Sequence, residues 1–130
     1  MEVDRKNKTA VHLCKHITQQ HDAYISIITV AEILTGSYQR SDMAVKKANQ
    51  VLRQFRWIPM GDTIADITAQ LTAYLLTTGK IIEFQDIVIA ASALAVQAEL
   101  LLTQNPTHFN RIPKLVDIVQ TLDQVNLEFD

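Results

Sequence analysis

The segment that decides the fold runs from Phe84 to Phe109 and reads FQDIVIAASALAVQAELLLTQNPTHF. Its first part, Phe84 to Ala98, is apolar on nearly every side of a helix, which predicts a helix that packs against more than one neighbour. Asp86 is the one formal charge between Glu83 and Glu99. It lies in the first helical turn, where the helix dipole favours an acid. The carboxylate is therefore either a structural feature of the helix or part of a site.

A short buried strand follows this helix at Leu100 to Leu102 and leads to Thr103 and Asn105. Ligand sites in open α/β sheets lie at the carboxyl ends of strands, so we expect Asn105 to lie at such a site. We expect the side chain of Asp86 to point into the same pocket.

A second acid, Glu32, occupies a comparable junction. The β-branched run Ala23 to Ile28 predicts a buried strand, and TVAEILTG follows at Thr29 to Gly36. Thr29 and Glu32 have the spacing of a capping box, and this spacing alone favours a structural role for Glu32. The position of Glu32 also puts a second carboxylate where a strand meets a helix, as with Asp86.

The rest of the chain alternates helices and short strands. The patterns predict helices at residues 10–20, 42–55 and 63–78 and strands at residues 57–60 and 115–119. Helices that alternate with short buried strands indicate a mainly parallel sheet covered on both faces. We expect a single domain over residues 1–130, with residues 1–8 irregular and residues 122–130 an irregular tail.

Composition limits the classes of function. The 130 residues carry a net charge of −2, which excludes a protein that binds nucleic acid by bulk charge. Cys14 is the one cysteine and suits a reducing cytosol. The apolar runs are too short to span a bilayer. We therefore expect a soluble, cytoplasmic protein that does not associate with membranes.

Two charged or polar patterns have ordinary explanations. His12 and His16 share a helix face, but Cys14 points away from them, so a zinc site is disfavoured. One side of the helix at residues 42–55 and its end carry basic residues, and a solvated face is favoured over a nucleic-acid contact. These residues are Lys46, Lys47, Arg53 and Arg56.

Three motifs in a fixed order resemble the PIN-domain family, in particular the VapC-type toxin ribonucleases of bacteria. They are ISIITVAEILTG, GKIIEFQDIVIAASAL and LLLTQNPTHFNRIP. The resemblance covers about residues 10–119. It implies a three-layer α/β fold, in which a mainly parallel sheet is flanked by helices on both faces. It also implies an Mg²⁺- or Mn²⁺-dependent ribonuclease with an acidic cluster at the carboxyl edge of that sheet.

The same resemblance implies the site residues. Glu32 matches the glutamate of a T-x-x-E element, and Asp86 matches the aspartate of a D-x-x-IAA element. Asn105 matches the last position of the cluster, in T-x-N/D-x-x-H-F, where many members have aspartate. Glu32, Asp86 and Asn105 are thus the expected catalytic residues, with Asp86 and Glu32 as metal ligands. Thr29 and Thr103 are expected to support them by hydrogen bonds.

Two further side chains near this cluster are open to a functional interpretation. Glu83, one turn before Asp86, is interpreted as a solvated loop residue. His108 allows a role as general base, but the interpretation that it covers a packed Phe109 is favoured.

One departure from the family pattern stands against these matches. PIN domains begin with a strand that ends in an L-D-T-N-like motif, whose aspartate is a central metal ligand. Asp4, followed by Arg5-Lys6-Asn7, does not match it. The first strand, which would lie between those at residues 23–28 and 100–102, is expected to be missing. A truncated PIN protein is favoured over a sheet that closes differently or pairs with another copy.

Three hypotheses follow for function. The first is a metal-dependent endoribonuclease, the toxin of a toxin–antitoxin pair, with RNA as substrate, an antitoxin as partner and a homodimer as the assembly. With two carboxylates, such a chain is expected to hold Mg²⁺ weakly and to show little or no nuclease activity. The second is a non-catalytic PIN-like module that binds a partner. The third, an unrelated nucleotide-binding α/β domain, is disfavoured because no glycine-rich phosphate-binding motif occurs.

Overall fold

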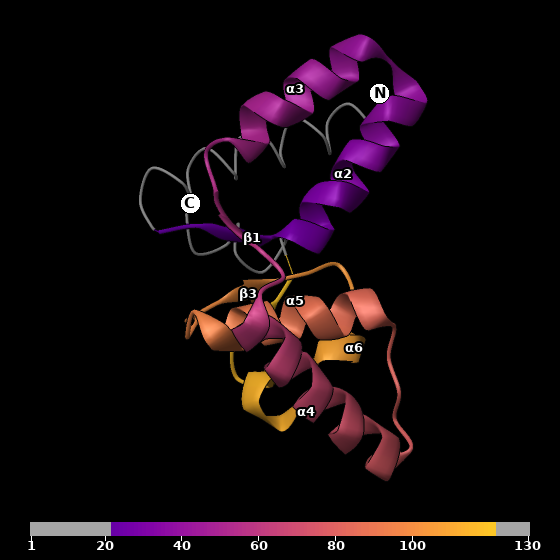
Figure 1. The fold of residues 1–130 in the computed structure, drawn as a ribbon, viewed down its shortest axis with the longest axis vertical. Coiled ribbons are helices and arrows are strands. Elements are labelled where there is room, and N and C mark those ends of the chain that lie inside the picture. The colour runs from indigo at the N-terminus through magenta and orange to yellow at the C-terminus, as the bar shows by residue number, and fades with distance from the viewer. Residues whose placement is uncertain (1–21, 122–130) are drawn as a thin grey trace. The chain divides into compact units, whose positions relative to one another are not determined.

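A computed structural model describes residues 22–121 of the chain (Figure 1). The chain divides into two compact units, with the boundary between Ile58 and Pro59. The helix predicted at residues 10–20, with its histidines and cysteine, and the tail at residues 122–130 lie outside the described residues. The expectation of a single domain stays a prediction.

The elements follow the predicted alternation of helices and short strands. The first unit contains β1 (Tyr24–Ser26), α2 (Ile27–Arg40), α3 (Asp42–Leu52) and β2 (Arg56–Ile58). The second unit contains α4 (Asp62–Thr78), α5 (Phe84–Ala95), β3 (Leu101–Leu102), α6 (Pro106–Phe109), the 3-10 helix η1 (Pro113–Leu115) and β4 (Val119–Gln120).

All strands between residues 22 and 121 pair in parallel, as the sequence predicts. β1 pairs with β2, and β3 pairs with β4. The α/β fold class, helix-rich with parallel strands, is confirmed. Within the described residues the strands form two pairs, so β1 and β3, the strands predicted to flank the missing one, belong to different pairs.

The helix α2 begins earlier than the capping-box spacing indicates. Ser26 is its N-cap, and the Ser26 side chain accepts a hydrogen bond from the backbone N–H of Ile28 at 3.3 Å. Thr29 consequently lies inside the helix, and the predicted capping box between Thr29 and Glu32 does not form. Serine is a better N-cap than threonine, and the earlier start brings Ile27, Ile28 and Thr29 into the helix.

The first unit is a helical hairpin closed by its strand pair (Figure 1). Ser41 caps α3, and its side chain accepts a hydrogen bond from the N–H of Ala44 at 3.0 Å. Leu52 is buried, and its carbonyl oxygen accepts a hydrogen bond from Nε1 of Trp57 at 2.8 Å, which fixes the turn into β2. Met43, although apolar, is 60% exposed in the first turn of α3.

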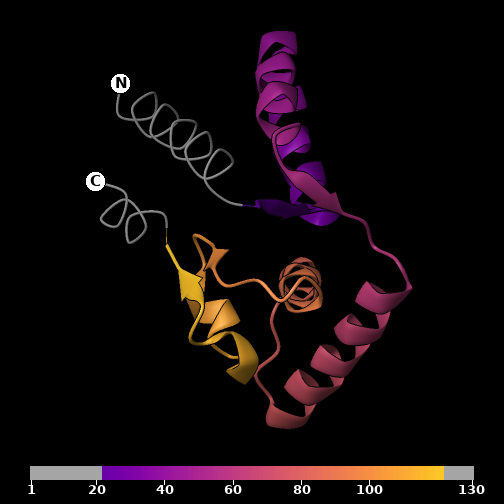
Figure 2. The same ribbon diagram turned by 90° about the vertical axis from the view of Figure 1, so that its left-hand side faces the viewer.

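The core of the second unit lies between α4 and α5, which pack against each other and cross, with α5 seen end-on in Figure 2. Leu71 and Leu75 on α4 are buried, as their spacing predicts. The helix α5 buries residues on most of its sides, including Ile87, Val88, Ala90, Ala91 and Ala93. Small alanine side chains permit close packing of neighbouring elements, so α5 forms the centre of this unit.

Two glycines and a proline set the ends of the elements. Gly61 is the N-cap of α4, and Gly79 ends it with a positive φ of 71°, as expected for a C-terminal glycine. Pro113 begins η1, so Leu115 is buried in a 3-10 helix rather than in the predicted strand. The last strand is correspondingly shortened to Val119–Gln120.

The membrane prediction can be compared with the described helices. None of the helices between residues 22 and 121 is both long and apolar enough to cross a bilayer.

Neighbouring leucines on α4 provide a test of this core. Leu75 is 1% exposed and Leu76 is 59% exposed. Leu75→Ala should lower the free energy of unfolding by about 2–5 kcal/mol because it leaves a cavity. Leu76→Ala, the control, should change it by less than about 0.5 kcal/mol. Urea unfolding followed by far-ultraviolet circular dichroism measures both, and equal effects would contradict the described packing.

Candidate functional site

Asp86 lies in the first turn of α5, as the sequence predicts. Its side chain is 14% exposed, because the apolar faces of α5 are packed around it. A carboxylate removed this far from water needs hydrogen-bonding or charged partners, since burying an unpaired charge is costly. The partner determines which oxygen stays open to a ligand.

His108 is that partner. Its Nδ1 lies 2.6 Å from Oδ2 of Asp86, a hydrogen bond that joins α6 to the start of α5. The imidazole is 35% exposed. Among residues 22–121, Oδ1 of Asp86 accepts no hydrogen bond, so this oxygen can receive a ligand.

Phe109 places this histidine. It is 1% exposed and anchors the four-residue helix α6 in the core of the second unit. The interpretation that Phe109 packs is confirmed, but His108 does more than cover it. The contact joins residues 22 positions apart in the sequence, and the spacing of apolar residues along the chain does not predict such a contact. The sequence offers one indication of a role for His108, because it is the only histidine between residues 22 and 121.

Asn105 lies at the start of the same turn. It is the N-cap residue of α6, its side chain makes no capping hydrogen bond, and it is exposed. Its backbone N–H donates to Oγ1 of Thr103 at 3.0 Å, and its carbonyl accepts from the N–H of His108 at 3.2 Å. Thr103 therefore orders the turn that contains Asn105. His108, the partner of Asp86, follows three residues later and is hydrogen-bonded to the backbone of Asn105.

Glu32 belongs to the first unit. It is exposed and lies within α2, one turn after the half-buried Thr29. Asp86 belongs to the second unit. The predicted meeting of Glu32 with Asp86 therefore stays a prediction. Glu83, the N-cap residue of α5, is exposed, in line with its interpretation as a solvated residue.

The donor atoms at these positions can be compared with the needs of a metal ion. Across residues 22–121, no group of three or more His, Cys, Asp or Glu residues is arranged to hold one. The predicted ligands offer carboxylate and amide oxygens, which are the hard donors that Mg²⁺ and Mn²⁺ take, together with water. The chemistry of the donor set thus fits these ions.

The chain resembles known proteins in both sequence and fold. The family model described as PIN domain matches residues 4–115, a range that spans both units. None of the curated proteins is significantly similar in sequence.

Several solved structures share the fold. One is VapBC-1 from nontypeable Haemophilus influenzae, with a TM-score of 0.74 and 21% identity over 92% of this chain and 88% of that one. Another is VapBC2 from Rickettsia felis bound to a DNA fragment from their promoter, with a TM-score of 0.72 and 27% identity over 84% and 81%. A third is FitAcB from Neisseria gonorrhoeae, with a TM-score of 0.65 and 26% identity over 88% and 83%.

The hydrogen bond between Asp86 and His108 can be measured by a double-mutant cycle with Asp86→Asn, His108→Gln and the double variant. Because both side chains are partly screened by water, we expect a coupling energy at the lower end of the usual range, about 0.5–1.5 kcal/mol. Urea unfolding at neutral pH supplies the free energies. If the two single effects simply add, within about 0.3 kcal/mol, the pair does not interact in solution.

Proposed function

This chain belongs to the PIN domain family, and on that premise we propose that it is a metal-dependent endoribonuclease, the toxin of a toxin–antitoxin pair. The observation that carries the proposal is the hydrogen bond of 2.6 Å between Asp86 and His108. It holds one oxygen of a largely buried carboxylate and leaves the other oxygen for a ligand. A carboxylate oriented in this way is what a metal site requires from its surroundings.

The roles of the residues follow from their chemistry. Asp86 and Glu32 would hold Mg²⁺ or Mn²⁺, with Asn105 beside them. Such an ion supplies an activated water and neutralises charge on a phosphodiester. His108 keeps the Asp86 carboxylate in one orientation. Asn105, with an exposed and neutral amide, orients water or a phosphate oxygen without adding negative charge. We also propose a cytoplasmic location for the protein and, for the chain as given, little or no nuclease activity.

The proposed partners are RNA as substrate, an antitoxin protein, and a second copy of the chain. Support for the antitoxin comes from the neighbours, since VapBC and FitAB structures at 27% identity resemble this chain over more than four fifths of its length. Exposed apolar side chains on the hairpin of the first unit also suit a protein partner. They are Ile33 at 41%, Tyr38 at 70% and Met43 at 60%.

The second candidate is a non-catalytic PIN module that binds a partner protein. The observation that favours it is the sequence Asp4-Arg5-Lys6-Asn7, which does not match the aspartate motif expected of the family. Metal binding separates the two candidates, because only the nuclease needs an ion at Asp86.

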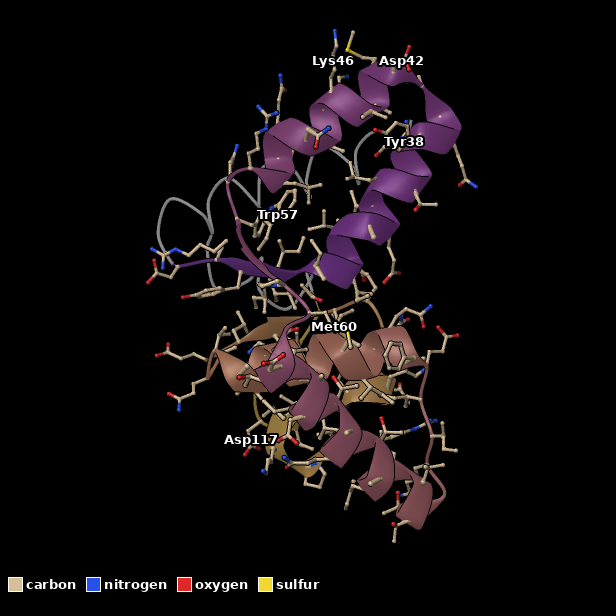
Figure 3. The ribbon with its side chains drawn as sticks, in the orientation of Figure 1. Tyr38, Asp42, Lys46, Trp57, Met60 and Asp117 are labelled. Carbon is tan, nitrogen blue, oxygen red and sulfur yellow. The ribbon has the colours of Figure 1, made fainter. Side chains whose placement is uncertain are left out.

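Mn²⁺ titration tests the proposed metal site. We expect weak binding that Asp86→Asn lowers by at least about tenfold, since removing a ligand costs no less than disturbing the residues around it. Asp117→Asn is the matched control, because Asp117 is an exposed acid of the same unit (Figure 3). Isothermal titration calorimetry measures both variants. Absence of binding by the wild-type chain would favour the non-catalytic module.

Paramagnetic broadening by Mn²⁺ tests the role of Glu32. If Glu32 and Asp86 share an ion, substoichiometric Mn²⁺ should broaden the amide NMR signals around both residues. Glu32→Gln should then weaken the broadening around Asp86 as well. Broadening confined to the surroundings of Asp86, and unchanged in Glu32→Gln, would remove Glu32 from the site while leaving Asp86 in it.

A further inference from the structure

The second unit contains a pocket that the roles above leave unexplained. It has a volume of about 380 Å³ and lies between the end of α4 and the segment that follows α6. We call it the basic pocket, and its lining residues are Gly79, Lys80, Ile81, Thr107, Asn110 and Arg111. A pocket of this size can accept a small ligand or part of a larger one.

Backbone geometry positions the two sides of the basic pocket. Gly79 reverses the chain at the end of α4, and the N–H of Lys80 donates to the carbonyl of Leu75 at 3.1 Å. On the other side, Nη1 of Arg111 donates to the carbonyl of Ile81 at 2.9 Å. No heavy atom lies within 4 Å of the place where a Cβ on Gly79 would stand, so this side of the pocket is open.

The lining carries positive charge without a counter-charge. It contains a lysine and an arginine but no acid. Between residues 22 and 121, neither Lys80 nor Arg111 forms an ion pair. The contact with Ile81 uses one of the five N–H donors of Arg111, and the others remain for a ligand. The hydroxyl of Thr107 and the amide of Asn110 add neutral donors.

An ordinary structural explanation accounts for part of this pattern. Lys80 follows the carboxyl end of α4, where a cation is favoured by the helix dipole. Arg111 ties the loop before α5 to the segment after α6. Neither explanation requires Lys80 and Arg111 to line the same pocket. Neither explanation supplies a negative charge to balance the two cations.

The basic pocket and the partner of Asp86 draw on the same chain segment. Thr107 lines the pocket, and the next residue, His108, holds the Asp86 carboxylate. The bond from Arg111 to Ile81 joins the same two chain segments as the bond from His108 to Asp86. A ligand in the pocket would thus contact the same short segment that holds Asp86.

From this placement we propose that the basic pocket binds a phosphate group of the RNA backbone next to the phosphodiester that is positioned at Asp86. The inference rests on the proposed function. Arginine can grip a phosphate through two N–H donors at once, and lysine contributes a compact positive charge. A site for a neighbouring phosphate would position the strand without reading its bases.

RNA binding in EDTA tests this proposal separately from metal binding and cleavage. The probe is a short single-stranded RNA of mixed sequence, and fluorescence anisotropy with the full chain gives the affinity at several salt concentrations. Lys80→Gln removes one phosphate contact. It should weaken binding several-fold and reduce the slope of log K against log salt by about 0.7. Arg111→Lys, which keeps the charge but loses the planar fork, should also weaken binding.

Two lysines serve as controls. Lys114 is exposed in η1 and does not line the pocket. Lys46 points away from α2 on the outer side of α3 (Figure 3) and lines a smaller basic hollow of about 230 Å³. We expect Lys114→Gln and Lys46→Gln to leave the salt slope close to that of the wild-type chain. A slope unchanged in Lys80→Gln, or lowered as much by Lys46→Gln or Lys114→Gln, would overturn the proposal.

A second measurement identifies the source of the phosphate. Inorganic phosphate and the RNA are each added to the wild-type chain while the amide NMR signals of Lys80, Thr107 and Arg111 are followed. The proposal expects the RNA to shift these signals and to displace inorganic phosphate. Shifts caused by inorganic phosphate alone would make the pocket a site for a free anion and overturn the RNA assignment. Because EDTA is present, neither result depends on the Mn²⁺ titration of Asp86→Asn.

Discussion

The hydrogen bond between Asp86 and His108 is the interaction on which the candidate site depends. A carboxylate that is 14% exposed would be costly to bury alone, and the imidazole at 2.6 Å supplies its partner. The bond exists because α5 is packed on most of its sides and because Phe109 fixes α6 in the core. The packing of the core therefore determines the geometry of the candidate site in this unit. Substitutions that loosen Phe109 should be read as changes to the site as well as to stability.

Local sequence patterns predicted most elements but not their ends. The apolar spacing of α4 and α5, the cap at Ser41 and the glycine that ends α4 were predictable, since each depends on neighbouring residues. The start of α2 was not, because Ser26 and Thr29 are both competent caps and tertiary packing decides between them. The exposure of Met43 likewise depends on which face of α3 meets α2.

The candidate site was predicted in part, for a comparable reason. Asp86 was found from its isolation within an apolar helix, and Asn105 from its place after a strand. The contact of His108 with Asp86 spans 22 residues and leaves no trace in periodicity. The basic pocket is also built from distant segments, so neither Lys80 nor Arg111 stood out in the sequence. The pairing of Glu32 with Asp86 rests on the family motifs, whose model spans both units.

The helix α6 is only four residues long, and its covalent structure has a consequence for any strand bound there. Thr107 faces the basic pocket, and its neighbour His108 holds the acid. Consecutive Cα atoms are about 3.8 Å apart across a trans peptide. The lining of the basic pocket and the partner of Asp86 are therefore adjacent positions of one short segment, which the buried Phe109 fixes in the core. One residue inserted between Thr107 and His108 would rotate the two side chains relative to each other by about 100°, so the length of α6 constrains the pocket and the acid at once.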